Sequence, residues 1–208
     1  MNVSQNLKQA KTKQAQLFSN TIVEKLTRTH IAVPVMLFIA ISTMLFYWST
    51  VHTDLALSSI VWSFLIGLIL FTWVEYNIHR YVFHISTSTP LRKKIQFIIH
   101  GIHHEFPKDK ERLAMPPLLS LFIAYMLLSL SKLIIGDFCY SFMAGFIIGY
   151  VIYISVHYIV HAFAPPHTIF KVLWINHAIH HYKNSNIAFG VSSPLWDYIY
   201  GTLNVKSK

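Results

Sequence analysis

The chain of 208 residues is long enough for one domain. Hydrophobic residues make up 54% of it and charged residues 12%, half of the about 25% typical of soluble domains, which excludes an ordinary water-soluble globule. An aromatic content of 15% excludes a disordered chain, and a single cysteine excludes a disulfide framework or a thiolate-rich metal site. The net charge is +9, and 13 histidines stand against eight acidic residues.

Residues 1–29 are polar and basic, and Phe18, Ile22 and Leu26 recur within them at four-residue steps. This spacing puts three apolar side chains on one helix face, so a helix lying on a membrane surface is expected there, with an unstructured tail as the alternative. The segment does not match a cleavable signal peptide, because the first apolar run starts too late and is long enough to span. We expect two regions, this N-terminal segment over 1–29 and a membrane domain over 30–208.

Four stretches lack Lys, Arg, Asp and Glu over the roughly 20 residues that a helix needs to cross a bilayer core. They predict spanning helices over 31–49, 55–78, 117–135 and 138–161. A soluble protein of this length could not enclose four such helices on all sides. The predicted fold class is therefore an all-α integral membrane protein with four transmembrane helices.

The basic residues are distributed asymmetrically about these predicted spans. Of the 17 Lys and Arg, 16 lie before the first span, between the second and third, or after the fourth, and only Lys132 lies elsewhere. The positive-inside rule then predicts that both termini and the long central loop are cytosolic. Attraction to anionic lipid headgroups explains the positive charge, and nucleic acid is not an expected partner, because no basic stripe with interleaved aromatics occurs.

Ten of the histidines form four clusters, all on the expected cytosolic side. The clusters are HRYVFH with His79 and His84, HGIHH with His100, His103 and His104, HYIVH with His157 and His161, and HAIHH with His177, His180 and His181. Neutral imidazoles packed together would leave ring nitrogens unsatisfied and protonated ones would repel, so bound metal ions are expected. The clusters predict a histidine-rich helical cap at the membrane surface, and His30, His52 and His167 are expected to lie outside the site.

Helix geometry supports metal binding by these clusters. Residues i, i+3 and i+4 share a helix face, so each HxxHH segment presents three imidazoles in one direction. His79 and His84 are about 140° apart on a regular helix, so either they bind two different metals or the helix is distorted there. Two octahedral metals sharing ten imidazoles would receive five each. Imidazole suits iron, copper, nickel and zinc, and iron would use the remaining positions to activate dioxygen.

The four boxes, in this order, resemble those of the fatty acid hydroxylase/sterol desaturase superfamily of membrane di-iron oxygenases. The segments HGIHHEFPKDKERLAMPP (100–117) and NHAIHHYKNSNIAFGVSSPLWDYIYGT (176–202) resemble the fatty acid 2-hydroxylase branch. This resemblance extends from Glu75 to Thr202. It implies O₂-dependent hydroxylation at C-2 of a fatty acid or lipid acyl chain, at two iron ions held by the ten clustered histidines and replaceable by zinc in isolated protein.

Other functions remain open at this point. A desaturase, a sterol methyl oxidase or a carotenoid hydroxylase would use similar boxes, while a bis-histidine haem protein and a metal transporter are alternatives from other classes. Eukaryotic relatives carry a fused cytochrome b5 domain with an HPGG box, which this sequence does not contain. A separate electron donor of ferredoxin or cytochrome b5 type is therefore expected at the basic face, and a bacterial inner membrane is favoured over the endoplasmic reticulum.

Three polar residues near the boxes are expected to act as catalytic residues by orienting the imidazoles. Glu75 lies one turn before His79, Asn176 directly precedes the last box, and Asp197 lies in the SPLWD turn. Metal-bound histidines usually donate their second ring N–H to such partners, and an ionisable group near the membrane boundary is a functional candidate.

Two further pairs of polar residues lie next to the boxes. Tyr182 and Lys183 follow the last box and are expected to bind the head group of the substrate. Asp109 and Arg112 are expected to pair as i and i+3 on a helical turn.

Overall fold

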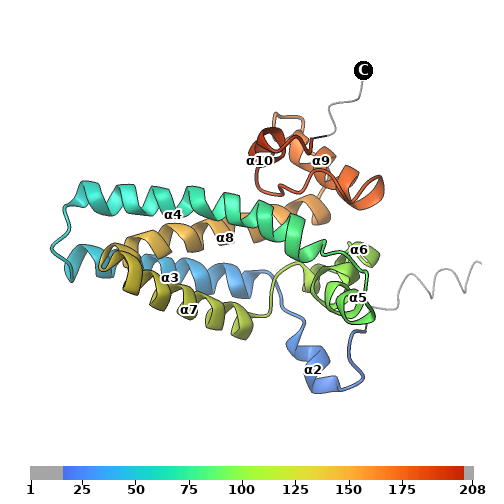
Figure 1. Cartoon of the computed structure of the whole chain (residues 1–208), viewed down its shortest axis with the longest axis horizontal. Coiled ribbons are helices and arrows are strands. Elements are labelled where there is room, and N and C mark those ends of the chain that lie inside the picture. Colours follow the sequence, from blue (N-terminus) through green and yellow to red (C-terminus); the bar gives the residue numbers. More distant parts are fainter. Residues whose placement is uncertain (1–15, 204–208) are drawn as a thin grey trace, which may run out of the picture.

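The computed structural model describes residues 16–203, and every regular element in this range is a helix. The predicted regions 1–29 and 30–208 therefore each extend beyond the described residues, by 1–15 and 204–208. Four long helices lie side by side as a bundle (Figure 1). They are α3 (Ala32–Val51), α4 (Leu57–Asn77), α7 (Pro117–Ile135) and α8 (Phe138–Ala162). All four are long and apolar enough to cross a membrane, which confirms the predicted fold class.

The predicted spans match these helices closely. The third coincides with α7, and the others differ by a few residues at their ends. The largest difference is in the second span, because α4 does not stop near residue 78 but continues directly into η1 (Ile78–Phe83), a π-helix. Together they form one helical rod of 27 residues, Leu57–Phe83.

Close packing of α4 against α8 sets the relative position of two histidine-bearing segments, η1, which continues α4, and the end of α8. A Cβ atom added to Gly67 would lie 2.0 Å from the carbonyl oxygen of Phe142, and one added to Gly145 would lie 1.9 Å from that of Phe64. Only glycine allows the two backbones to approach this closely, as small residues do in membrane helix pairs. Helix α3 packs on α8 through a core that includes Phe38. The ends of α4 and α8 are thereby held together where their histidines lie.

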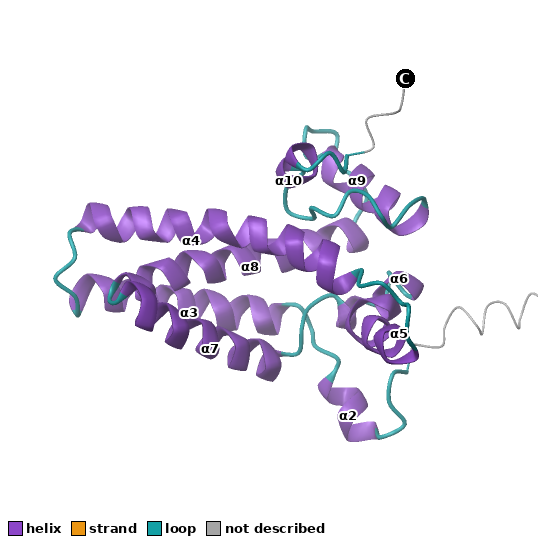
Figure 2. Ribbon diagram, in the orientation of Figure 1, coloured by secondary structure: helices purple, strands orange, loops and turns teal. Residues whose placement is uncertain are grey.

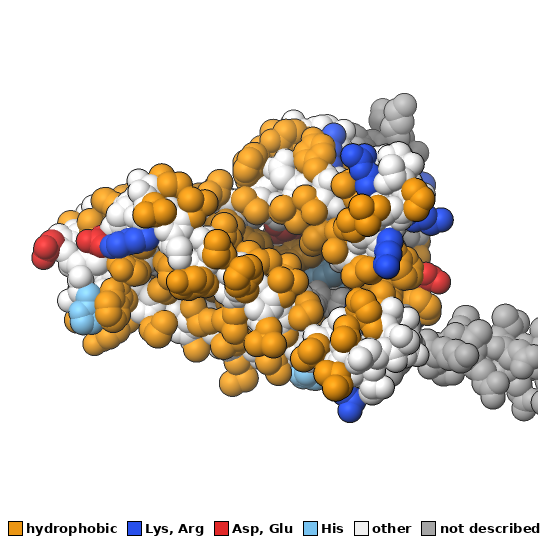
Figure 3. Space-filling view, turned by 60° about the horizontal axis from the view of Figure 1, so that its bottom comes forward, with side chains coloured by type: hydrophobic (Ala, Val, Ile, Leu, Met, Phe, Trp, Pro, Cys, Tyr) orange, Lys and Arg blue, Asp and Glu red, His pale blue; other side chains and the backbone are white. Residues whose placement is uncertain are grey.

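Most outward side chains of the bundle are apolar and exposed in the isolated chain, as expected for helices that face lipid. Leu133 of α7 is 85% exposed, and Ser120 is the one buried residue in this helix. Figure 3 shows hydrophobic side chains covering the long body of the molecule, with most Lys and Arg gathered at the end that carries the cap.

Short helices form a cap beyond one end of the bundle (Figure 2). They are α5 (Pro90–Gln96), η2 (Phe97–Gly101), α6 (Ile102–Glu105), η3 (Lys110–Arg112), α9 (Lys171–Tyr182) and α10 (Leu195–Ile199). The predicted histidine-rich helical cap is thus present. Helix α2 (Thr21–Leu26) lies at the same end of the bundle (Figure 1).

The N-terminal segment contains a helix, but it is shorter than its apolar spacing suggested. Helix α2 starts after Asn20, whose side chain accepts hydrogen bonds from the N–H groups of Ile22 and Val23. Phe18 therefore lies outside the helix, and the Asn cap explains why. Ile22 and Leu26 are exposed.

Candidate metal centre

The ten clustered histidines come together as two groups of five where the cap meets η1 and the end of α8. The His79 group contains His79, His84, His100, His104 and His180, and the His157 group contains His103, His157, His161, His177 and His181. Within each group, one ring nitrogen from every histidine lies within 4.8 Å of the others. His30, His52 and His167 belong to neither group.

Each HxxHH segment contributes histidines to both groups. The outer two histidines, at i and i+4, enter one group, and the middle one, at i+3, enters the other. Thus His100 and His104 join the His79 group while His103 joins the His157 group. In the last box the outer histidines, His177 and His181, belong to the His157 group, and the middle one, His180, belongs to the His79 group. The three rings of each segment share one face of the helix, as predicted, but this face lies between the two groups and contributes to both.

A π-helix explains how residues five positions apart enter one group. In η1 the N–H of His84 donates to the carbonyl oxygen of His79 over 3.2 Å, an i→i+5 hydrogen bond. This wider turn brings both rings to the same side, where a regular helix would separate them. Of the two alternatives left open by the sequence, the structure has the distorted helix. A second π-helix, η2, contains His100 and leads into α6, which carries His103 and His104.

The spacing of the ring nitrogens fits metal coordination. Six pairs of neighbouring Nε2 atoms within the two groups are 2.7–3.1 Å apart. For metal–nitrogen bonds of about 2.1 Å, ligands at right angles would be about 3.0 Å apart and tetrahedral ligands about 3.4 Å apart. The groups therefore suit an octahedral arrangement with five imidazoles. Such a site would also explain why so many unprotonated ring nitrogens face one another.

Backbone carbonyl groups hold several of these rings in a defined tautomer. Three Nδ1 atoms lie within hydrogen-bond distance of main-chain oxygens: His79 with Phe189 at 2.5 Å, His180 with Ile187 at 2.8 Å and His157 with Leu113 at 3.1 Å. A neutral imidazole that donates from Nδ1 keeps the Nε2 lone pair free for a metal ion. The donor set therefore fits divalent metals that prefer nitrogen ligands.

The protein environment disfavours protonation of these rings. Burial, together with the neighbouring charge of His180, lowers the pKa of His84 to about 3 and of His104 to about 4. Burial also lowers the pKa of His180 to about 4, although the hydrogen bond to Ile187 opposes this shift. In the unfolded chain these groups would take up protons near the ordinary histidine pKa of about 6.5. Neutral imidazole is the form that binds metal.

These pKa values predict that acid destabilises the metal-free protein. Between about pH 6.5 and about pH 4 the unfolded chain binds more protons than the folded one, so the free energy of unfolding falls as the pH falls. At about pH 5, His180 alone should cost about 2 kcal/mol, and the half-buried His84 and His104 should each cost less. Thermal unfolding of metal-free protein in detergent at about pH 7.5 and about pH 5 tests this prediction. An unchanged midpoint would contradict it.

Glu75 is buried and contacts the loop 187–192, which we name the anchoring loop, rather than an imidazole. Its carboxylate accepts hydrogen bonds from the N–H groups of Val191 and Ser192, both at 2.9 Å, and from the Ser192 hydroxyl. The anchoring loop supplies the carbonyl groups that face His79 and His180. Glu75 therefore touches the His79 group only through this loop.

Asp197 holds the same loop from its other side. Its two oxygens accept hydrogen bonds from the N–H groups of Phe189 at 2.8 Å and Gly190 at 2.7 Å, and the Thr202 hydroxyl donates to it at 2.6 Å. A Cβ atom on Gly190 would lie 2.2 Å from the carbonyl oxygen of Ser193, so only glycine fits at this point. Asp197 is fully buried, and its contacts fix the turn that presents the Phe189 carbonyl to His79.

The remaining predicted site residues lie around α9. Asn176 is buried beside His177, and its side-chain nitrogen has no hydrogen-bond partner among the described residues. Tyr182 lines a cavity of about 340 Å³ together with three rings of the His157 group, those of His161, His177 and His181. Lys183 is exposed and does not line this cavity.

Two cavity-lining residues were missed by sequence reasoning. Lys108 and Trp174 both line the cavity beside the His157 group. Lys108 lies in the loop after α6, far from Tyr182 in the sequence, and no motif connects the two. The Trp174 indole donates a hydrogen bond to the carbonyl oxygen of Phe163 at 2.9 Å, which ties α9 to the end of α8.

Comparisons with known proteins identify a family model and relatives that match the part of the chain containing all ten clustered histidines. The family model described as fatty acid hydroxylase matches residues 64–202, from within α4 to just beyond α10. The ceramide very long chain fatty acid hydroxylase of Schizosaccharomyces pombe is 36% identical over 194 residues, covering 90% of this chain and 54% of the relative. The dihydroceramide fatty acyl 2-hydroxylase 1 of Arabidopsis thaliana is 33% identical over 155 residues, covering 74% of this chain and 65% of the relative.

The fold is also similar to a solved structure. Full-length Scs7p, of which only the hydroxylase domain is visible, superimposes with a TM-score of 0.83 at 30% sequence identity, covering 91% of this chain and 72% of the other. The chain spans about half the length of the first curated relative that it matches. With the family model matching across both histidine groups, this chain belongs to the fatty acid hydroxylase family.

Proposed function

We propose that this protein is a membrane-bound di-iron oxygenase that hydroxylates C-2 of a fatty acid or lipid acyl chain. The observation that carries the proposal is the pair of five-imidazole groups at one end of a membrane bundle, in a chain of this family. Relatives named as a ceramide fatty acid hydroxylase and a dihydroceramide fatty acyl 2-hydroxylase support the choice of C-2 and of a lipid acyl substrate.

The ten histidines would hold two iron ions, which when bound supply the activation of dioxygen. Their Nε2 spacing and their neutral state both support metal binding, and zinc, which also prefers imidazole, would occupy the same positions in isolated protein. A haem is disfavoured, because five imidazoles converge in each group and occupy positions that a porphyrin would need.

The other residues of the site would position groups rather than react. Glu75 and Asp197 would fix the anchoring loop and so the orientation of His79 and His180, and Asn176 would support His177 from within α9. The cavity beside the His157 group would receive the carbonyl end of the acyl chain, with Tyr182 at its wall. Lys183 would contact the head group outside this cavity.

The surroundings of the site suggest how substrate and electrons reach it. The acyl chain would enter from the bilayer, because the cap directly continues the spanning helices. Both termini and the cap would face the cytosol, as the distribution of Lys and Arg predicts. Two electrons per turnover would come from a separate donor of ferredoxin or cytochrome b5 type.

Product analysis tests the proposed reaction. Expression of the protein in a host that lacks 2-hydroxylated lipids should produce 2-hydroxy acyl species, detected by mass spectrometry after lipid hydrolysis. The His180→Ala variant serves as the inactive control at equal expression. A new double bond, or a hydroxyl group at another carbon, would contradict the assignment to C-2.

A further inference from the structure

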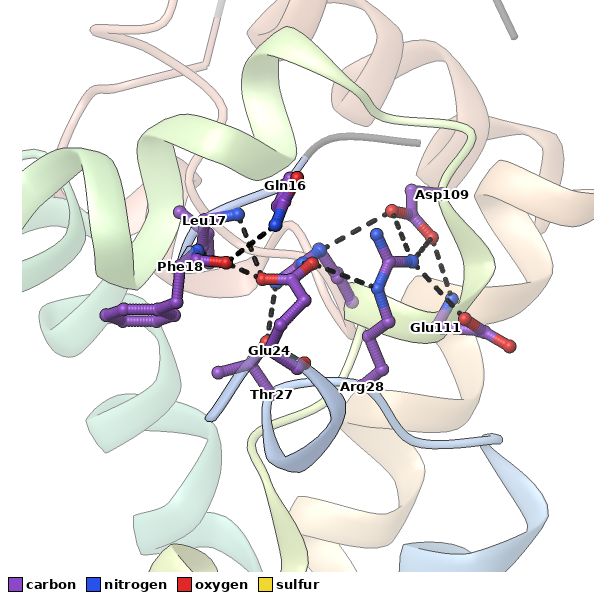
Figure 4. A network of polar contacts seen from close by, with 9 residues as sticks. Gln16, Leu17, Phe18, Glu24, Thr27, Arg28, Asp109 and Glu111 are labelled. Carbon is purple, nitrogen blue, oxygen red and sulfur yellow. Dashed lines mark hydrogen bonds and ion pairs between the residues drawn. The ribbon is translucent and has the colours of Figure 1, made fainter. Parts of the chain in front are cut away.

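A network of charged side chains fastens the N-terminal segment to the loop that follows the second histidine box (Figure 4). We name its four central residues the N-terminal clamp: Glu24, Arg28, Asp109 and Arg112. Arg28 pairs with Glu24 at 3.2 Å within the segment and with Asp109 at 3.2 Å across to the loop. Arg112 pairs with Glu24 in the opposite direction, so the two chain segments are joined by reciprocal ion pairs.

Backbone groups complete the attachment. Glu24 accepts hydrogen bonds from the N–H groups of Leu17 at 3.0 Å and Phe18 at 3.1 Å, which fold the chain before α2 onto the network. The N–H of Thr29 donates to the carbonyl oxygen of Glu111 at 2.9 Å. The segment is thus held to the loop along its length, and the expected Asp109–Arg112 pair, at 3.5 Å, is only one part of a larger network.

The clamp is partly withdrawn from solvent. The exposed fractions of the four side chains are 12% for Glu24, 15% for Arg28, 9% for Asp109 and 4% for Arg112. Although burial alone would raise the pKa of Glu24, the N–H donors of Phe18 and Leu17 and the charge of Arg112 hold this pKa below its ordinary value. Each of the four charges has two partners of opposite sign within the clamp, so the ion pairs fix how the N-terminal segment lies on the loop.

The clamped loop connects directly to the His157 group. Arg112 is followed by Leu113, which is buried and whose carbonyl oxygen lies 3.1 Å from Nδ1 of His157. The other end of the loop begins after α6, which carries His103 of the His157 group and His104 of the His79 group. The loop carbonyl group that contacts a ring, that of Leu113, contacts His157. The Nε2 atoms of His103 and His157 are 3.0 Å apart. One end of the loop therefore follows the helix that carries His103, and the other end contacts the ring of His157, which belongs to the same group.

The two histidine groups therefore have separate supports. Glu75 and Asp197 fix the anchoring loop behind His79 and His180, whereas the clamp fixes the loop behind His157. We propose that the N-terminal segment is a positioning element for the His157 group, which uses the clamp to set the metal affinity of that group alone. This inference rests on the proposed function only in taking the two groups as metal sites.

Metal titration of the full chain tests this proposal. In wild-type protein in detergent, Zn²⁺ competed against a chromophoric chelator should fill two sites. Glu24→Gln should lower the affinity of one site by roughly 10–100-fold, the usual cost of losing the support of a metal ligand, and leave the other unchanged. Arg28→Lys keeps the charge but loses the planar fork, so a smaller loss is expected from a variant that should accumulate well. Lys25→Gln is the matched control, because Lys25 is an exposed charged residue next to Glu24 on α2. This variant should bind both ions as wild type does.

Single-site backgrounds identify which group responds. In His180→Ala protein the remaining intact group is the His157 group, and adding Glu24→Gln should weaken its Zn²⁺ affinity roughly 10–100-fold. In His177→Ala protein the His79 group remains, and adding Glu24→Gln should change nothing. Equal weakening in both backgrounds would mean that the clamp only stabilises the cap, and no weakening in either would mean that it positions nothing. Both results would overturn the proposal, and neither depends on whether a hydroxylated product is formed.

Discussion

Replacing His180 with alanine is expected to abolish hydroxylation while the protein still inserts and folds. His180 has no solvent exposure, its Nε2 atom lies 3.0 Å from that of His84, and its Nδ1 atom faces the Ile187 carbonyl. Alanine would remove one of five imidazoles from the His79 group and open a gap that water can fill. Because a ligand itself is lost, the effect should exceed the roughly 10–100-fold typical of losing a partner of a ligand.

Two measurements on the purified variant check this result. Turnover should fall to background, and the bound metal should drop from two ions per chain to one, while helix content by circular dichroism stays as in wild type. His167→Ala is the control, because His167 belongs to neither group and this variant should keep both ions. Near-normal turnover of His180→Ala with both ions bound would contradict the ligand assignment.

Replacing Glu75 with alanine is expected to give a large loss of stability. The carboxylate accepts hydrogen bonds from two backbone N–H groups and one hydroxyl group in a buried site. Alanine would leave all three donors without an acceptor, at about 1–3 kcal/mol for each donor. The anchoring loop should then loosen, so metal should be lost from the His79 group before the His157 group. Thermal unfolding with and without added metal, together with metal analysis, measures both effects.

Glu75→Gln separates hydrogen bonding from charge at this position. The glutamine oxygen can still accept from the Val191 and Ser192 N–H groups, and its amide can donate to the Ser192 hydroxyl. We therefore expect this variant to keep most of its stability and both ions. If glutamine proved as damaging as alanine, the negative charge itself would be required, and the positioning role derived from the loop contacts would be insufficient.

Much of the architecture was predictable from the sequence because membrane helices are encoded locally. Long apolar stretches without charge define the four spans, and the double proline at the start of α7 marks its first residue, so this helix was predicted at both ends. The histidine clusters were visible for the same reason, since the spacing within each box is a property of one helix. Because all four clusters lie at the same ends of the predicted spans, the histidines were expected to come together on one side of the membrane.

The division of the histidines into two groups could not be read from the sequence. It depends on the π-helix at His79 and on the crossing of His103 and His180 between groups, both of which are set by packing of distant helices. The sequence left open whether the helix is distorted between His79 and His84, and the i→i+5 hydrogen bond that shows the distortion is visible only in the folded structure. The position of Glu75 and Asp197 near the boxes marks them as candidates, but the loop through which they act is visible only in the fold.

The supports of the site were the least predictable part. Glu24 meets Arg112 across 88 residues of sequence, and Glu75 meets Val191 across 116. Each partner taken alone resembles an ordinary charged or apolar residue, so its role appears only when the fold brings the two together. The same holds for Lys108, which lines the cavity beside residues far from it in the sequence.

An experimental density map of the iron-loaded protein, with anomalous scattering recorded at the iron edge, tests the central claim most directly. We expect two anomalous peaks in the cap, one surrounded by the Nε2 atoms of the His79 group and the other by those of the His157 group. A map with the ten rings in place but no cation between them, or with one ion only, would contradict the account.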